Sequence, residues 1–305
     1  MAFSATEAAF EGFRMAREKP GAIIAWAVFY LLYTVLLTAA LVQVMGPEMS
    51  TMMQQGREPT TDPAEAMALL QTLGKLYAVL LPLGLVFSAV LLCAVYRAVL
   101  RPQEKGLGYL KFGGDELRMM LLFVILFLLF LVFYVVILIA GSVVGVAVGA
   151  AAAAAGGQPS AIAGIFVVVS SALMLAALIY FLVRLSLAGP ATFARRKLTL
   201  GAAWRMTKGR FWSLFGAYLL AVVLALVVML LVYAIGAGVA LAVGGGMEGL
   251  TGMFMPDFSS LQAYFSPGRI ALTLVGSVVS GLIAAIMYAP AAVAYRELSG
   301  EGVSA

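Results

Sequence analysis

Two adjacent carboxylates, Asp115 and Glu116, are the strongest candidates for chemistry in this sequence. They are the only neighbouring acids in the chain, and paired carboxylates can serve general acid and base catalysis. They also stand directly before a long apolar run, where acidic side chains stabilise the positive end of a helix dipole. Helix capping is the simpler interpretation, so we expect a helix to start here.

The rest of the chain offers little for catalysis or metal binding. It contains no histidine, which removes serine–histidine and cysteine–histidine nucleophiles and histidine-based zinc sites. The single cysteine, Cys93, lies in an apolar run and is expected to be a buried thiol. Gly244 to Gly246 does not follow a strand, the context that a phosphate-binding loop requires. We therefore expect no enzyme, no cofactor and no metal site.

Two short basic segments repeat one pattern of residues. Trp204 to Trp212 reads WRMTKGRFW, Phe13 to Gly21 reads FRMAREKPG, and an apolar run follows each. Basic amphipathic helices lie in the headgroup layer of a membrane, where each cation gains about 1 kcal/mol from anionic lipid. The candidate headgroup contacts are Arg14, Arg17, Lys19, Arg205, Lys208 and Arg210. Ordinary anchoring is the alternative, since cations flank membrane spans in any case.

The residues around both segments predict short surface helices. Ser4 to Glu7 fits a capping box at the start of the first one. Ala9, Phe13 and Ala16 would form its apolar stripe, turned toward the lipid. The later helix has an equivalent stripe, formed by Leu200, Trp204, Thr207 and Phe211.

The composition is that of a membrane protein. Hydrophobic residues make up 64% of the chain, charged residues 11%, and the mean hydropathy is +1.06. About 20 apolar residues are needed to cross a bilayer as a helix. Six runs meet this requirement: Gly21 to Met45, Leu76 to Leu100, Met119 to Gly149, Ala161 to Leu187, Trp212 to Val243 and Ile270 to Val293. The predicted fold is all-α and polytopic, a single integral membrane domain with amphipathic surface helices on the cytoplasmic side.

The cations predict how the chain is oriented. If both termini and the second and fourth loops lie on one side, that side holds 16 of the 19 cations, which makes it cytoplasmic. This membrane signal explains the basic pI near 9.3, and nucleic-acid binding is rejected. Trp204, Trp212 and Arg184 are the expected interface anchors. Arg184 would extend its stem toward the headgroups, with an anion or substrate contact as the alternative.

A three-fold repeat of helical hairpins is one interpretation of the chain. An offset of 191 residues aligns Phe13-Arg14-Met15 with Trp204-Arg205-Met206, and Leu117-Arg118-Met119 is a weaker third copy. The units would cover 1–105, 106–197 and 198–305, each with a surface helix followed by two spans. The alternative is that all membrane helices begin and end in similar ways.

Small residues and helix breakers suggest where spans pack or bend. Gly141, Gly145 and Gly149, and likewise Ser277 with Gly281, form small-xxx-small faces that permit close helix contact within the bundle. Homo-oligomerisation through such a face stays open. The candidate helix breaks are Pro82, Pro290, Gly236 and Gly238.

Two of the loops predicted to lie on the non-cytoplasmic side are expected to contain helices. Asp62-Pro63 can start one that runs toward the second span, with proline at the first helical position. Phe258, Leu261 and Phe265 are spaced as on a short surface helix within Met247 to Phe265.

The stretch Lys197 to Leu220, KLTLGAAWRMTKGRFWSLFGAYLL, carries a resemblance to known proteins. It resembles the membrane domain attached to some bacterial glycerophosphodiester phosphodiesterases, and related uncharacterised six-span bacterial membrane proteins with an AW-x-L-T-x-G-x-F-W-like segment. The chain has no counterpart of the phosphodiesterase's catalytic domain with its essential histidines, so we do not expect that activity. The resemblance implies a location in the bacterial cytoplasmic (inner) membrane and supplies no site residues.

Two functions are compatible with these features. The first is a non-enzymatic integral membrane protein that organises or recognises membrane lipid, including anionic lipid, or a membrane protein partner. The alternative is a permease for a lipid or another apolar solute. Charged residues are nearly absent from the middle of the spans, which disfavours a proton-coupled pump or an ordinary ion channel.

Overall fold

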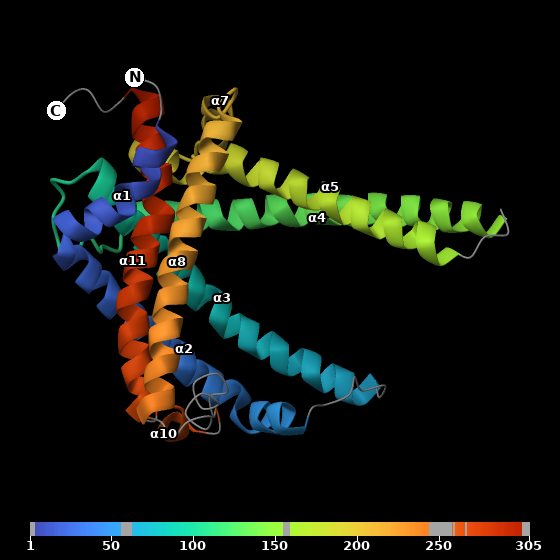
Figure 1. The fold of residues 1–305 in the computed structure, drawn as a ribbon, viewed down its shortest axis with the longest axis horizontal. Helices are drawn as coiled ribbons and strands as arrows, with labels where there is room; N and C mark the ends of the chain where they lie inside the picture. Colours follow the sequence, from blue (N-terminus) through green and yellow to red (C-terminus); the bar gives the residue numbers. More distant parts are fainter. Residues whose placement is uncertain are drawn as a thin grey trace.

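The computed structural model describes residues 4–55, 63–154, 159–243, 258, 260–265 and 267–300. Within these ranges every regular element is a helix, which confirms the all-α prediction for them (Figure 1). The helices are α1 (Ala5–Glu18), α2 (Pro20–Gln55), α3 (Pro63–Leu100), α4 (Gly114–Ala154), α5 (Pro159–Leu185), α6 (Ala188–Arg195), α7 (Leu200–Met206), α8 (Phe211–Val243), α10 (Leu261–Tyr264) and α11 (Pro267–Ser299).

Six of these helices, α2, α3, α4, α5, α8 and α11, are long and apolar enough to cross a membrane. The architecture is therefore that of a multi-pass integral membrane protein, and the six predicted spans correspond to these helices in order. The fourth span was predicted two residues too long, since α5 ends at Leu185. As expected, α3 starts at Pro63, because proline has no amide hydrogen and the first helical position needs none.

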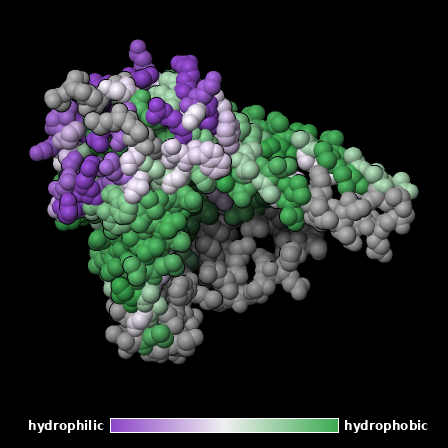
Figure 2. All heavy atoms as spheres, turned by 45° about the horizontal axis from the view of Figure 1, so that its top comes forward, coloured by the Kyte–Doolittle hydropathy of each residue, from purple (hydrophilic) through white to green (hydrophobic). Residues whose placement is uncertain are grey.

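The packed core lies at one end of the molecule. It joins the start of α2 at Trp26, the end of α3 at Val95, the start of α4 at Leu122, the start of α8 at Leu214 and the end of α11 at Tyr295. Figure 2 shows hydrophilic residues gathered over one end, with apolar residues covering most of the coloured surface elsewhere. We call this end, formed by α1, α6, α7 and residues 101–113, the charged end.

Away from the charged end, the helices diverge. The α4–α5 hairpin points in a clearly different direction from α8 and α11 (Figure 1). Its large apolar side chains, such as Val132, Ile139, Val146 and Leu173, are exposed to whatever surrounds the protein. In a bilayer they would contact lipid tails, which are as apolar as these side chains are.

Helix α1 is packed against protein over much of its length. Its Ser4 cap accepts a hydrogen bond from the Glu7 amide at 3.3 Å, as predicted. The buried face centres on Gly12, because a Cβ added there would lie 2.5 Å from the Ile286 backbone of α11. The predicted lipid-facing stripe of Ala9, Phe13 and Ala16 is therefore wrong in part: Ala9 is buried and Phe13 packs beside Ile286.

The two small-residue faces behave differently. Gly281 of α11 confirms close packing, since an added Cβ would lie 3.0 Å from the Ile23 carbonyl oxygen of α2. The expectation for α4 is wrong for two of its three glycines within the described chain, because a Cβ at Gly141 or Gly149 would meet nothing within 4 Å. That part of α4 lies on the diverging α4–α5 hairpin (Figure 1).

The expected helix breaks do not occur. Helix α3 continues through Pro82, α11 continues through Pro290, and α8 continues through Gly236 and Gly238. No backbone is unwound at these positions to coordinate an ion or a solute.

The repeat and the outside segments agree only partly with the structure. Residues 101–113 hold no helix before α4, and the third sequence copy lies inside α4 itself, so the second unit lacks the expected surface helix. The three-fold repeat stays a prediction. The outer surface helix is shorter than expected: α10 spans Leu261–Tyr264, capped by Ser260. Asp62 and most of Met247 to Phe265 lie outside the described residues.

Replacing Gly12 with alanine should loosen the contact between α1 and α11. The added methyl would meet backbone rather than a flexible side chain, so overpacking should lower the free energy of unfolding by about 1–3 kcal/mol. Thermal unfolding of the purified protein in detergent measures this loss. Gly21→Ala is the matched control, since a Cβ there meets nothing within 4 Å, and equal melting temperatures for the two variants would contradict the packing described.

Candidate functional site

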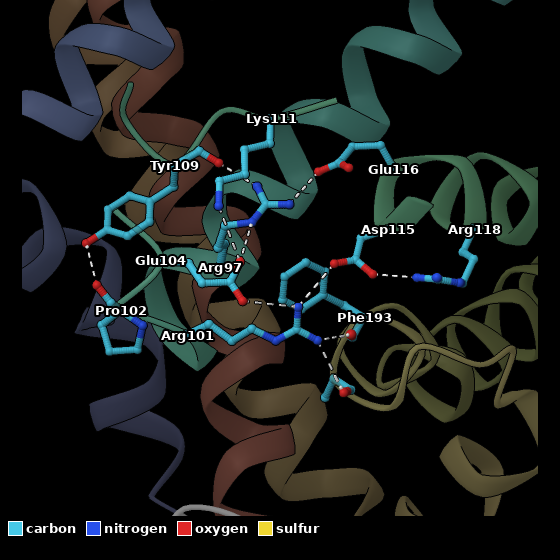
Figure 3. A network of polar contacts seen from close by, with 11 residues as sticks. Arg97, Arg101, Pro102, Glu104, Tyr109, Lys111, Asp115, Glu116, Arg118 and Phe193 are labelled. Carbon is cyan, nitrogen blue, oxygen red and sulfur yellow. Dashed lines mark hydrogen bonds and ion pairs between the residues drawn. The ribbon is translucent and has the colours of Figure 1, made fainter. Parts of the chain in front are cut away.

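The end of α3 and the start of α4 are joined by a buried ion pair. Arg97 donates to Glu116 at 2.5 Å, and their side chains are 2% and 1% exposed. Arg97 also donates to the Tyr109 carbonyl oxygen at 2.5 Å (Figure 3). A buried pair of this kind is strongly destabilised when one partner is removed, because the other charge is then left without compensation.

A second arginine connects the same region to α6. Arg101 pairs with Asp115 at 3.1 Å and donates to the Phe193 carbonyl oxygen at 2.8 Å, while its guanidinium lies 4.5 Å from the Phe193 ring centroid. Arg118 donates a hydrogen bond to the other carboxylate oxygen of Asp115 at 2.5 Å. Glu104 lies between Arg97, Arg101 and Lys111 at 3.6, 3.7 and 3.5 Å (Figure 3). We call these seven residues the charged junction: Arg97, Arg101, Glu104, Lys111, Asp115, Glu116 and Arg118.

This geometry agrees with the capping interpretation of Asp115 and Glu116. Both lie in the first turn of α4, as capping predicts, and both are engaged by guanidinium groups. In this arrangement the two acids hold α3, α4 and α6 together.

The loop at residues 101–113 connects α2 to the charged junction through a hydrogen bond. Trp26 of α2 donates its indole N–H to the Gly108 carbonyl oxygen at 2.6 Å. Gly108 has φ of +60°, and a Cβ there would lie 2.3 Å from the Ala25 side chain, so the position requires glycine. Lys19 donates to the Ala98 carbonyl oxygen at 2.7 Å and lies 5.2 Å from the Tyr109 ring.

The six predicted headgroup cations therefore differ in availability. Lys19 is bound by the protein itself, and Arg14 pairs with Glu11, whose hydrogen bond raises the pKa of the Arg14 guanidinium above its ordinary value. The other four are exposed: Arg17, Arg205, Lys208 and Arg210. The structure brings the last three together on α7 and its connection to α8.

An apolar cavity of about 780 Å³ lies beside the charged junction, between α3, α4, α5, α8 and α11. Its lining on α4 runs from Leu122 to Phe130, which is about 12 Å along a helix axis. Polar groups in the lining are few and consist of the hydroxyls of serine and tyrosine side chains. Tyr218 donates to the Ser186 hydroxyl at 2.8 Å, and Ser186 donates to the Val183 carbonyl oxygen at 2.8 Å. Tyr96, next to Arg97 in the sequence, also lines the cavity.

Arg184 does not extend to the surface, contrary to the sequence prediction. It is 6% exposed, and its guanidinium lies 4.3 Å from the Trp204 ring centroid. Trp204 is held against it by α7, which Thr207 ties to α5 through a hydrogen bond to the Arg184 carbonyl oxygen at 3.0 Å. The apolar stripe of α7 therefore faces α5 rather than lipid. Trp212, by contrast, is 78% exposed, as an interface anchor would be.

Comparisons with known proteins assign no family. The chain matches no family model, and no curated protein and no solved structure matches it. Function is therefore inferred from the charged junction, the cavity and the surface cations.

Sequence reasoning missed the Arg97–Glu116 pair and the cavity. Arg97 follows an apolar run, and an arginine in that position needs a counter-charge if it is buried. Asp115 and Glu116 are the first adjacent acids after it, so the partner was visible in the sequence. The cavity had no such signal, because its lining residues are the same types that face lipid.

Glu116→Gln should destabilise the protein strongly, because the buried Arg97 loses its carboxylate partner at 2.5 Å and keeps only Glu104, at 3.6 Å. We expect a loss of about 3–5 kcal/mol in the free energy of unfolding, measured by chemical or thermal denaturation in detergent. The double variant Arg97→Met with Glu116→Met should recover most of this loss, since it removes both charges. Glu18→Gln, at an exposed position of α1, is the control. A Glu116→Gln protein as stable as this control would contradict the role assigned to the pair.

Proposed function

We propose that this protein is a non-enzymatic membrane protein of the bacterial inner membrane that recognises a membrane lipid. The cavity carries the proposal: its volume of about 780 Å³ lies within the 300–1,000 Å³ typical of ligand pockets. Apolar side chains line most of it, and Ser186 and Tyr218 supply hydrogen-bonded hydroxyl groups. An acyl chain matches this distribution, with the ester or headgroup region placed near Ser186 and Tyr218.

The position of the cavity favours lipid over a soluble apolar ligand. It lies among five helices that can cross a membrane, so the surrounding hydrocarbon is its natural source of ligands. Two of its hydroxyl groups lie toward the charged end of the molecule, where Ser186 follows α5 and Tyr96 stands near the end of α3. A phospholipid entering the cavity would therefore have its headgroup close to the surface.

We place the charged end in the cytoplasm, with both termini on that side. The exposed cations Arg17, Arg205, Lys208 and Arg210 would contact anionic lipid there, each contributing about 1 kcal/mol. Trp212 would anchor α8 at the interface. The resemblance to the phosphodiesterase membrane domains supports the same location and stays a proposal.

Filling the cavity should displace the lipid. Leu182 and Leu219 line it and are half-exposed, so Leu182→Trp with Leu219→Trp should fit without disturbing the core. Native mass spectrometry of protein released from lipid nanodiscs should show a tightly held lipid on the wild type, with occupancy at least about tenfold lower on the double variant.

The matched control is Leu175→Trp with Leu230→Trp. These leucines lie on the same two helices, α5 and α8, with similar exposure, and do not line the cavity. The control should retain lipid as the wild type does. A cavity-filled protein with an unchanged lipid complement would contradict the proposed function.

Lipid transport is the second candidate, and the divergence of the hairpins favours it. Because the α4–α5 hairpin points away from α8 and α11 (Figure 1), the cavity borders a region through which a lipid could move between the helices. Reconstituted vesicles with a fluorescent phospholipid should then show protein-dependent flux that the cavity-filling variant abolishes. The absence of flux for a panel of lipids would leave lipid recognition without transport.

A further inference from the structure

Arg184 is a buried cation without an anionic partner in the part of the chain that the structure describes. It lies one residue before the end of α5 and is 6% exposed. Its Nε is fully buried and has no hydrogen-bond acceptor. Its side chain is paired instead with two aromatic rings, Trp204 at 4.3 Å and Tyr180 at 6.0 Å from the guanidinium carbon.

This environment differs from that of the other buried arginine. The Nε of each arginine is without an acceptor, but Arg97 has Glu116 and a carbonyl oxygen as acceptors for its terminal nitrogens, whereas Arg184 contacts two ring faces. An aromatic face attracts a cation but accepts no in-plane hydrogen bond from the guanidinium fork. Burying the Nε–H of Arg184 without an acceptor is unfavourable, so an acceptor from outside the chain would complete the site.

The sequence around Arg184 supplies no counter-charge. From Leu117 to Met247 the chain contains no Asp or Glu. The same stretch contains these eight cations: Arg118, Arg184, Arg195, Arg196, Lys197, Arg205, Lys208 and Arg210. The last three follow Trp204 closely in the chain and are exposed, so they would attract an anion toward the ring that covers Arg184.

We infer that Arg184 and the α7–α8 connection form a binding site for the phosphate of an anionic phospholipid headgroup. The planar guanidinium matches phosphate oxygens with paired hydrogen bonds. Tyr180 and Trp204 are residues typical of the interface between headgroups and hydrocarbon. Apolar residues of α5 and α8, which can both cross a membrane, flank the site and would contact the acyl chains of the same lipid.

This site is separate from the cavity. Arg184 does not line the cavity, although its neighbours Val183 and Leu185 do. At 3.6 residues per turn, Leu182, which also lines the cavity, lies on the opposite face of α5 from Arg184. The inference therefore goes beyond the proposed function, and either site can fail its test without the other.

The test follows thermal unfolding of the full chain in a neutral detergent with phosphatidylglycerol, phosphatidylcholine or inorganic phosphate added at matched ionic strength. Phosphatidylglycerol should raise the melting temperature of the wild type, and the other two should not. Arg184→Gln should bind phosphatidylglycerol at least about tenfold more weakly. Without lipid it should melt at or above the wild-type temperature, because the uncompensated buried charge is gone. Lys75→Gln, at an exposed position of α3 far from the charged end, should respond as the wild type does.

Three results would overturn the inference. Equal phosphatidylglycerol affinity of Arg184→Gln and wild type would show that Arg184 binds no headgroup. Equal stabilisation by inorganic phosphate alone would make this a site for soluble phosphate. An Arg184→Gln protein that melts well below the wild type, with no lipid effect on either, would give Arg184 a purely structural role. The cavity-filled variant of Leu182 and Leu219 should keep the response to phosphatidylglycerol, which separates this test from that of the proposed function.

Discussion

The buried pair between Arg97 and Glu116 is the interaction on which the rest of the structure depends. It joins the last turn of α3 to the first turn of α4 at 2.5 Å. Arg97 also fixes the Tyr109 carbonyl oxygen, while Trp26 of α2 binds the neighbouring Gly108. Three helices are thus aligned by one guanidinium and the loop beside it. Elsewhere the large apolar side chains of α4 are mostly exposed, so the direction of the α4–α5 hairpin is set at this junction.

The cavity follows from the same constraint. Tyr96 and Arg97 are neighbours on α3, and the first lines the cavity while the second holds the junction. On α4, Glu116 belongs to the charged junction and Leu122 lines the cavity. Because the hairpins meet at the charged end and diverge beyond it, an apolar space remains among α3, α4, α5, α8 and α11. In a membrane, the acyl chain of a lipid would fill such a space.

Hydropathy was sufficient to predict the six long helices, since a run such as Met119 to Gly149 has no other stable place than a membrane. The sequence also indicated a helix start at Asp115, which the structure confirms. What it did not indicate was which apolar faces meet protein. A Cβ at Gly281 would meet the backbone of α2, while a Cβ at Gly141 would meet nothing within 4 Å, although both glycines lie on faces of small residues. Lipid and protein interiors are equally apolar, so composition does not distinguish them.

The burial of a charged residue was equally hard to predict from the sequence. Arg184 was predicted to extend toward headgroups because it stands at the end of a span. In the structure, the Trp204 ring covers it. That contact joins α5 to α7 between residues that are 20 positions apart in the chain. No local sequence pattern predicts it. The segment WRMTKGRFW therefore has two parts: its tryptophan packs inward on a buried arginine, and its cations Arg205, Lys208 and Arg210 face outward.

The central claim is that the diverging helices hold a lipid between them, and an experimental structure in lipid nanodiscs tests it most directly. Electron cryo-microscopy with a bound antibody fragment would provide the map. The account predicts elongated acyl-chain density among Leu122, Leu182 and Leu219, with the headgroup end near Tyr218 and Ser186. A map in which α4 closes directly onto α8 and no cavity remains would contradict it.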